Sequence, residues 1–149
     1  MISTFDTNVL VYATSAADAA KAARARALIT RGMRSAGSIL LLQTLGEFAN
    51  VAIRKAGLAP DLVARTIDAW RAVLPIHPAA EEDLPAALAM VRDHRVQFWD
   101  ALLLATARRI GVRALLTEAM QDGRVIGGIR LVNPFLPGND GAVDQILPP

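Results

Sequence analysis

Short apolar runs alternate along the chain with longer segments in which apolar residues recur at helical spacing. The short runs, rich in β-branched residues and leucine, predict strands at residues 2–6, 38–42, 74–77, 114–117 and 129–132. The longer segments predict helices at residues 7–13, 17–34, 43–56, 60–72, 79–93 and 98–110. Strands that alternate with helices in this way indicate an α/β fold with a mostly parallel sheet covered on both faces.

Glycine and proline mark several of the predicted element ends. Gly57 and Gly111 are typical of helix C-termini, whereas Pro60 and Pro78 are typical of helix starts or breaks. The sequence shows no internal repeat, linker or low-complexity segment, and only the tail from about Pro134 is expected to be irregular. We therefore expect residues 1–149 to form a single domain.

Composition narrows the class of protein. A chain of 149 residues with 53% apolar content is long enough for one substantial core. It has no basic segment followed by an apolar one at its start and no long apolar run, so we expect no signal peptide, no membrane span and a cytoplasmic location. The absence of cysteine excludes disulfides, thiolate zinc sites and a cysteine nucleophile, and only His77 and His94 supply imidazole. Any metal would be held by oxygen, which favours Mg²⁺ or Mn²⁺.

The basic residues are nearly all arginine, although the net charge is only +2. Arginine binds phosphate through two parallel hydrogen bonds. The segment from Lys21 to Arg34 forms one basic predicted helix that could contact a nucleic acid or an acidic partner. The same residues could equally form a solvated helix face.

Two aspartates stand where packing alone favours other residues. Asp6 ends the first predicted strand, and open parallel sheets bind ligands just beyond the carboxyl ends of their strands. An ordinary helix cap would also explain Asp6. Asp100 interrupts the apolar helix predicted at residues 98–110, where a partly buried carboxylate is costly unless a cation compensates it. The alternative for Asp100 is a first-turn acid near solvent, favoured by the helix dipole.

A third acid, Glu47, lies on a helical stripe with Gln43, Asn50 and Arg54. That stripe can simply face water. Taken together with Asp6 and Asp100, however, Glu47 completes a set of three carboxylates on separate elements. Such a set suggests a divalent metal.

The segments around these acids carry a family resemblance. They are, in chain order, Phe5-Asp6-Thr7-Asn8-Val9-Leu10-Val11-Tyr12, the helix around Glu47, Phe98-Trp99-Asp100-Ala101-Leu102, Leu115-Leu116-Thr117-Glu118 and Arg130-Leu131-Val132-Asn133-Pro134-Phe135. This ordered set resembles the PIN-domain ribonucleases, most closely the toxins of bacterial VapBC-type toxin–antitoxin pairs. The resemblance implies a three-layer α/β/α sandwich around a mostly parallel sheet of about five strands, with the acids at its carboxyl edge. It also implies metal-dependent RNA cleavage, a cognate antitoxin and a homodimer.

In this hypothesis Asp6 and Asp100 bind Mg²⁺ or Mn²⁺ directly or through water, and Glu47 orients or deprotonates the attacking water. Asn8 and Thr117 would hold the metal-binding carboxylates by hydrogen bonds. Hydrolysis would need no nucleophile from a side chain.

One position departs from the family pattern. A further acid commonly follows the Thr-Glu pair in the family, whereas Ala119 follows Thr117-Glu118 here. Glu118 or Asp122 could substitute, although Asp122-Gly123 is also typical of a turn. A catalytically impaired RNA- or antitoxin-binding module is therefore the alternative. Phosphotransfer receiver domains and aspartyl phosphatases fit poorly, since the chain lacks a late lysine and has Asn8 two residues after Asp6.

Overall fold

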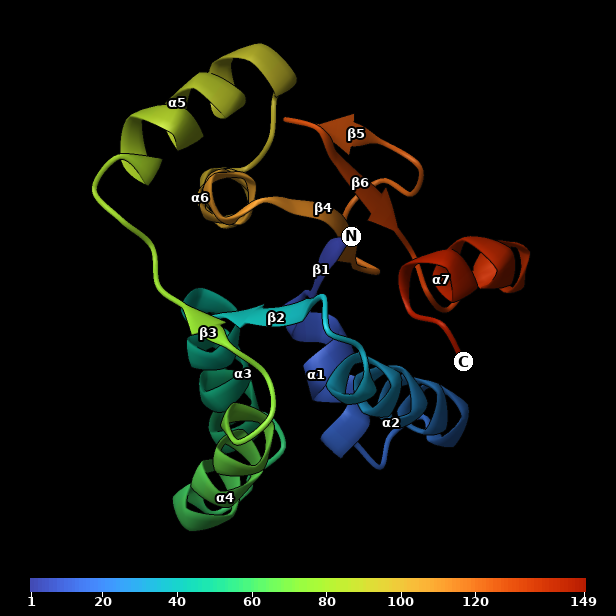
Figure 1. The fold of residues 1–149 in the computed structure, drawn as a ribbon. Coiled ribbons are helices and arrows are strands. Elements are labelled where there is room, and N and C mark those ends of the chain that lie inside the picture. The colour runs from blue at the N-terminus through green and yellow to red at the C-terminus, as the bar shows by residue number, and fades with distance from the viewer.

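A six-stranded sheet forms the centre of the computed structural model, which describes residues 1–149 (Figure 1). Its strand order is β3-β2-β1-β4-β6-β5, and every neighbouring pair is parallel except β5 and β6. The strands are β1 (Ile2–Phe5), β2 (Ser38–Leu41), β3 (Ile76–His77), β4 (Val112–Leu116), β5 (Val125–Ile126) and β6 (Ile129–Val132). The central strands β1 and β4 therefore end at the same edge of the sheet.

Seven α-helices and one short 3₁₀ helix surround the sheet. They are α1 (Thr7–Thr14), α2 (Ala19–Arg34), α3 (Leu42–Arg54), α4 (Pro60–Arg71), α5 (Asp83–His94), α6 (Phe98–Ile110), η1 (Pro137–Asn139) and α7 (Asp140–Ile146). Asp18 caps α2 by accepting a hydrogen bond from the Lys21 amide, and Gly111 ends α6 at φ +96°, a conformation that glycine adopts without strain.

The two faces of the sheet bury separate cores. One core contains 20 buried residues and packs the sheet against α1, α2, α3, α4 and α7, whereas the other contains 16 and packs it against α5 and α6. Successive residues of a strand point to opposite faces, so in β2 Leu40 belongs to the first core while Ile39 and Leu41 belong to the second. The predicted three-layer α/β/α sandwich is confirmed, and Figure 1 shows α5 and α6 across the sheet from α1 to α4.

The prediction of an irregular tail from about Pro134 is wrong. The tail forms η1 and α7, and α7 buries Val143 and Ile146 in the first core. Arg31 of α2 pairs with Asp144 and also donates to the carbonyl of Leu147. These contacts are long-range, so the proline-rich composition of the tail gave no sign of them.

Other boundaries shift by a few residues. The helix expected from residue 79 begins at Asp83, and the residues before it form a tighter turn in which the Asp83 amide donates to the Ala80 carbonyl at 3.0 Å. The sheet also gains the two-residue strand β5, which pairs with β6 in an antiparallel hairpin and gives six strands rather than about five. Periodicity cannot predict so short a strand.

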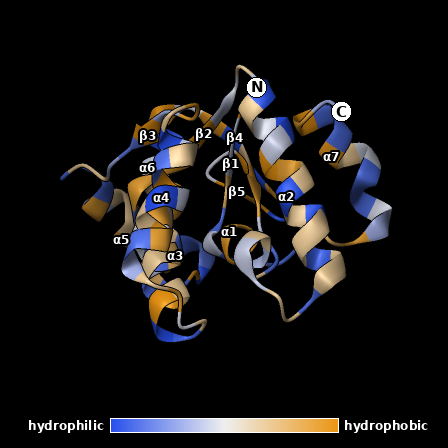
Figure 2. Cartoon of the chain, turned by 90° about the horizontal axis from the view of Figure 1, so that it is seen from below, coloured by the Kyte–Doolittle hydropathy of each residue, from blue (hydrophilic) through white to orange (hydrophobic).

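Figure 2 shows hydrophilic and hydrophobic residues alternating along α2, α4 and α7, whereas α6 buries every residue from 101 to 107. None of the helices combines the length and apolar character that crossing a membrane would require.

Candidate active site

The predicted acids lie on three elements around the carboxyl edge of the sheet. Asp6 directly follows β1, and its amide donates a hydrogen bond to the carbonyl of Leu116 at the end of β4. Glu47 lies on α3 and Asp100 in the first turn of α6. The two helices belong to opposite layers of the sandwich, so the sheet edge lies between them.

Asp6 is buried, with only 6% of its surface exposed, and has no cationic partner. One carboxylate oxygen accepts from the Thr7 amide at 2.8 Å, which is the helix cap that the sequence allowed. The other accepts from the Thr117 hydroxyl at 2.7 Å. Burial raises the pKa of Asp6; the hydrogen bonds from Thr117 and Thr7 offset part of this effect, and the nearby charge of Glu47 adds to it. Asp6 therefore caps α1 with one carboxylate oxygen, while Thr117 holds the other.

Glu47 is exposed, yet both of its carboxylate oxygens are held. One accepts from the Thr7 hydroxyl at 2.7 Å, and the other from the Gln43 amide group at 2.9 Å. The same Gln43 nitrogen donates to the carbonyl of Trp99 at 3.0 Å. Thr7 follows Asp6 and Trp99 precedes Asp100, so these bonds tie Glu47 to the elements that carry the other two acids.

Asp100 is half-buried and makes no hydrogen bond or ion pair through its side chain. Burial raises its pKa, and the charges of Asp6 and then Glu47 raise it further. The structure thus brings all three predicted carboxylates within electrostatic reach of one another. A partly buried acid without a cation is the costly case that the sequence indicated.

Asn8 and Thr117 lie beside Asp6. The Asn8 amide group donates to Asp6 and to the Thr117 hydroxyl oxygen, both at 3.4 Å, and its carbonyl oxygen accepts from the Glu118 amide at 3.1 Å. Thr117 is fully buried. Both side chains orient the Asp6 carboxylate.

A family model for the PIN domain matches residues 4–118, which include every one of these side chains. The chain belongs to the PIN-domain family. The resemblance seen in the sequence is confirmed, and the fold is that of a PIN domain. A search of curated protein sequences finds no match to the chain.

Solved structures share this PIN fold. One chain of a toxin–antitoxin complex from Klebsiella pneumoniae superimposes with a TM-score of 0.66 and 22% identity over 89% of this chain and 98% of the other. FitAcB from Neisseria gonorrhoeae gives 0.64 and 16% over 90% and 99%. The Mycobacterium tuberculosis toxin VapC20, which cleaves the sarcin–ricin loop, gives 0.62 and 20% over 76% and 86%. At these identities the likeness establishes the fold.

Glu118, one of the two acids that could substitute at position 119, bonds to other residues of this PIN domain and not to Asp6, Glu47 or Asp100. It accepts hydrogen bonds from the Tyr12 hydroxyl at 2.5 Å and from the Lys21 ammonium at 2.6 Å. Burial alone would raise its pKa, but the hydrogen bonds from Lys21 and Tyr12 outweigh burial and lower the pKa. Lys21 thus already supplies the cation that Glu118 needs.

The other substitute, Asp122, has a structural role at the turn that the sequence indicated. One of its oxygens accepts from the Asn133 amide and from the Asn139 side chain, both at 2.8 Å, and the Asn133 bond is the main cause of its lowered pKa. Ala119 instead lines a pocket together with Asp100. The position next to the acids is therefore occupied by alanine.

The donor set of this PIN domain fits a hard divalent cation. Asp6, Glu47 and Asp100 offer carboxylate oxygens and none forms an ion pair, so their mutual repulsion is uncompensated. No three of these side chains converge closely enough to hold an ion as they stand. Asp6 is fixed by hydrogen bonds, whereas Glu47 is exposed and Asp100 is only half-buried.

Thr7 and Gln43 were not predicted as site residues. Thr7 was a visible neighbour of Asp6, and Gln43 lies four residues before Glu47, a spacing at which side chains on a helix meet. The polar stripe that contains Gln43 is equally consistent with a helix face exposed to solvent. The bond from Gln43 to Trp99 joins residues 56 positions apart, which no local pattern reveals.

Proposed function

We propose that this PIN domain is a Mg²⁺- or Mn²⁺-dependent ribonuclease and the toxin of a toxin–antitoxin pair. One observation carries the proposal. Three carboxylates, just after β1, on α3 and in the first turn of α6, lie within electrostatic reach of one another, and no lysine or arginine forms an ion pair with them. A folded protein retains such an arrangement at a cost in stability, and a bound cation removes that cost.

Asp6 and Asp100 would hold the metal ion, which supplies an activated water and offsets the charge that develops on the phosphate oxygens. The Thr117 and Thr7 bonds fix Asp6, so one carboxylate keeps its position. Glu47 would accept the proton of the attacking water. The Thr7 hydroxyl and the Gln43 amide orient the two Glu47 oxygens toward this task.

The toxin role and its partners rest on the related folds. The matched Klebsiella and Neisseria structures are described as a toxin–antitoxin complex and FitAcB, and VapC20 as a toxin that cleaves the sarcin–ricin loop. An apolar pocket of about 430 Å³ between α3 and α4, lined by Leu42, Leu45 and Ile67 among others, supports a cognate antitoxin partner. Exposed Leu84 and Leu88, one turn apart on α5, support a homodimer. We infer a cytoplasmic location for such a toxin.

The test is RNA cleavage by the purified protein without antitoxin, in Mn²⁺ or Mg²⁺ and again in chelator. Asp100→Asn should lower cleavage roughly 100-fold or more, as removal of other groups that stabilise developing charge does. Asp61→Asn, which removes an exposed acid from α4, is the matched control and should cleave normally. RNA that is bound but left intact in both metals would contradict the proposal and indicate the impaired binding module.

A further inference from the structure

A second feature lies beside Asp100. A pocket of about 180 Å³ opens between the α5–α6 connection and the loop after β4. Its polar lining combines Asp100 with two arginines and two glutamines, and Ala119 adds only a methyl group: the residues are Arg95, Gln97, Asp100, Ala119, Gln121 and Arg124. Positive charge therefore shares a pocket with Asp100 without forming an ion pair with it.

Arg95 has an unusual backbone and an unpaired side chain. It ends α5 with φ 54° and ψ 37°, the only non-glycine residue with a positive φ. Helices usually place glycine or asparagine in this conformation, because a Cβ atom is strained there. Its guanidinium group takes part in no hydrogen bond or ion pair, and the residue is exposed. A strained arginine with no structural partner indicates a role toward a ligand.

Arg124 is held in place beside it. One of its terminal nitrogens donates to the carbonyl of His94, the residue before Arg95. A guanidinium group has five N–H donors in a fixed plane, so this bond leaves most of them available. The two arginines thus lie on the same pocket, and the second is anchored to the end of α5.

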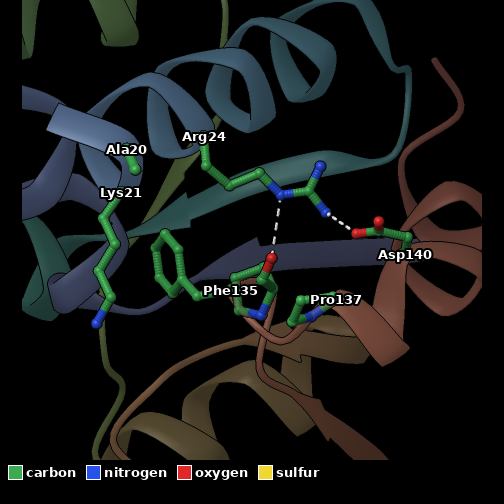
Figure 3. Close-up of a pocket in the computed structure, with 7 residues that line it drawn as sticks. Ala20, Lys21, Arg24, Phe135, Pro137 and Asp140 are labelled. Atoms are coloured by element: carbon green, nitrogen blue, oxygen red, sulfur yellow. Dashed lines mark hydrogen bonds and ion pairs between the residues drawn. The ribbon is translucent and has the colours of Figure 1, made fainter.

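The larger pocket drawn in Figure 3 shows the contrasting case. It has a volume of about 280 Å³ and also contains two cations, Lys21 and Arg24. Arg24 donates to the carbonyl of Pro134 at 3.0 Å and pairs with Asp140 at 2.8 Å, while Lys21 pairs with Glu118. Both cations are already neutralised. An anion would have to displace an existing partner there, but not at Arg95.

We propose that Arg95 and Arg124 bind a phosphate of the RNA strand next to the phosphate that is cleaved. This inference rests on the proposed ribonuclease function. Guanidinium groups bind phosphate oxygens through paired hydrogen bonds, and the shared wall at Asp100 places this subsite beside the reacting centre. Successive phosphates of one strand then occupy the metal site and the arginine pocket, which fixes the position of the strand.

The experiment measures binding of a labelled single-stranded RNA in chelator, where cleavage is not expected, at several salt concentrations. The variants are Arg95→Asn, Arg95→Lys and the matched control Arg65→Gln, which removes an exposed arginine from α4. Asparagine tolerates the left-handed conformation, so Arg95→Asn should fold and melt at or above the wild-type temperature. It should flatten the slope of log affinity against log salt by about 0.7, the value for one lost phosphate contact on a single strand. Arg95→Lys should keep most of the slope, and Arg65→Gln all of it.

Cleavage assays on the same proteins separate the two proposals. If the wild type cleaves RNA with metal and Arg95→Asn shows an unchanged salt slope, the phosphate subsite is refuted while the nuclease stands. If the wild type neither binds nor cleaves RNA, the proposed function fails and the subsite fails with it.

Discussion

Two buried aspartates, Asp83 and Asp6, show opposite solutions to the same electrostatic problem. Asp83 is 1% exposed and accepts hydrogen bonds from the Ala80 amide, the Thr106 hydroxyl and the guanidinium group of Arg109. Burial alone would raise its pKa, but the Arg109 contact and the other hydrogen bonds outweigh burial and lower it. Asp6 has comparable neutral donors, a second acid nearby and no cation, and its pKa is raised.

Burial by itself raises the pKa of both aspartates, and the cation that Asp83 has and Asp6 lacks therefore distinguishes the structural ion pair from the candidate site. Glu118 follows the Asp83 pattern through its contact with Lys21, whereas Asp100 follows the Asp6 pattern. Asp83 links α5 to α6, and Arg109 already compensates its charge. Asp6 and Asp100 have no such partner, and we propose that a cation from solution compensates them.

Removing Arg109, the cation that pairs with buried Asp83, should have the largest effect on stability. Arg109→Met leaves Asp83 buried and uncompensated. We expect the free energy of unfolding to fall by about 3 kcal/mol. This is the low end of the range for breaking a buried ion pair, because Arg109 is itself 33% exposed. Urea denaturation measures this loss, with Arg108→Met as the matched control. A loss under about 1 kcal/mol would place the pair among ordinary surface ion pairs.

Removing the hydroxyl that links Asp6 to Glu47 should mainly affect catalysis. Thr7→Val keeps the size and the backbone cap but loses the bond to Glu47, and we expect kcat to fall about 10- to 100-fold, as with other residues that orient active-site ligands. Thr7→Ser retains the hydroxyl and should restore most of kcat. Steady-state kinetics with an RNA substrate measures both; equal losses in the two variants would show a packing role instead.

Relieving the repulsion of Asp100 by Asp6 and Glu47 should stabilise the metal-free protein. Because the pKa of Asp100 is raised by folding, the folded state binds more protons than the unfolded chain between about pH 3.9 and the folded pKa, and stability falls as pH rises through that window. Asp100→Asn should therefore stabilise the metal-free protein at neutral pH by about 0.5–1 kcal/mol, because Asp100 is only half-buried and solvent screens the repulsion. That corresponds to about 2–4 °C per kcal/mol in a chain of this size.

Thermal melting in chelator at pH 5 and pH 7.5 measures this effect. The variant should also depend less on pH than the wild type. A lower melting temperature for Asp100→Asn at neutral pH would show that Asp100 already has a compensating partner.

The smallest expected effect comes from adding a fourth acid. Ala119 shares a pocket with Asp100, so Ala119→Asp should tighten Mn²⁺ binding roughly threefold or more, since the affinity of oxygen-ligand sites rises with ligand charge. Ala119→Asn has the same size without the charge and serves as the control. Unchanged affinity on titration would mean that position 119 cannot reach the ion.

The sequence predicted the parts of the molecule that local chemistry controls. The five main strands and the six longer helices followed from apolar periodicity. Asp6 and Asp100 stood out as polar residues at apolar positions, whereas Glu47 lay on a polar stripe and was selected only together with them. The proposal that Thr117 holds a metal-binding carboxylate followed from the family resemblance, and the structure shows its hydroxyl donating to Asp6.

The remaining features depend on long-range contacts. Helix α7 is stabilised by burial of Val143 and by the ion pairs from α2, and β5 exists only as the partner of β6. Whether Glu118 was free could not be decided until Lys21, 97 positions away, was placed beside it. Sequence patterns identify a carboxylate, but only the folded structure shows which cation it meets.

The most direct test of the central claim is a calorimetric titration of the purified, metal-free protein with Mn²⁺, in parallel with Asp100→Asn and Asp61→Asn. We predict saturable binding by the wild type and by Asp61→Asn, and at least about 10-fold weaker binding by Asp100→Asn, because the variant loses one charged oxygen ligand. Equal binding by all three proteins, or no binding by the wild type, would show that the unpaired carboxylates are not a metal site.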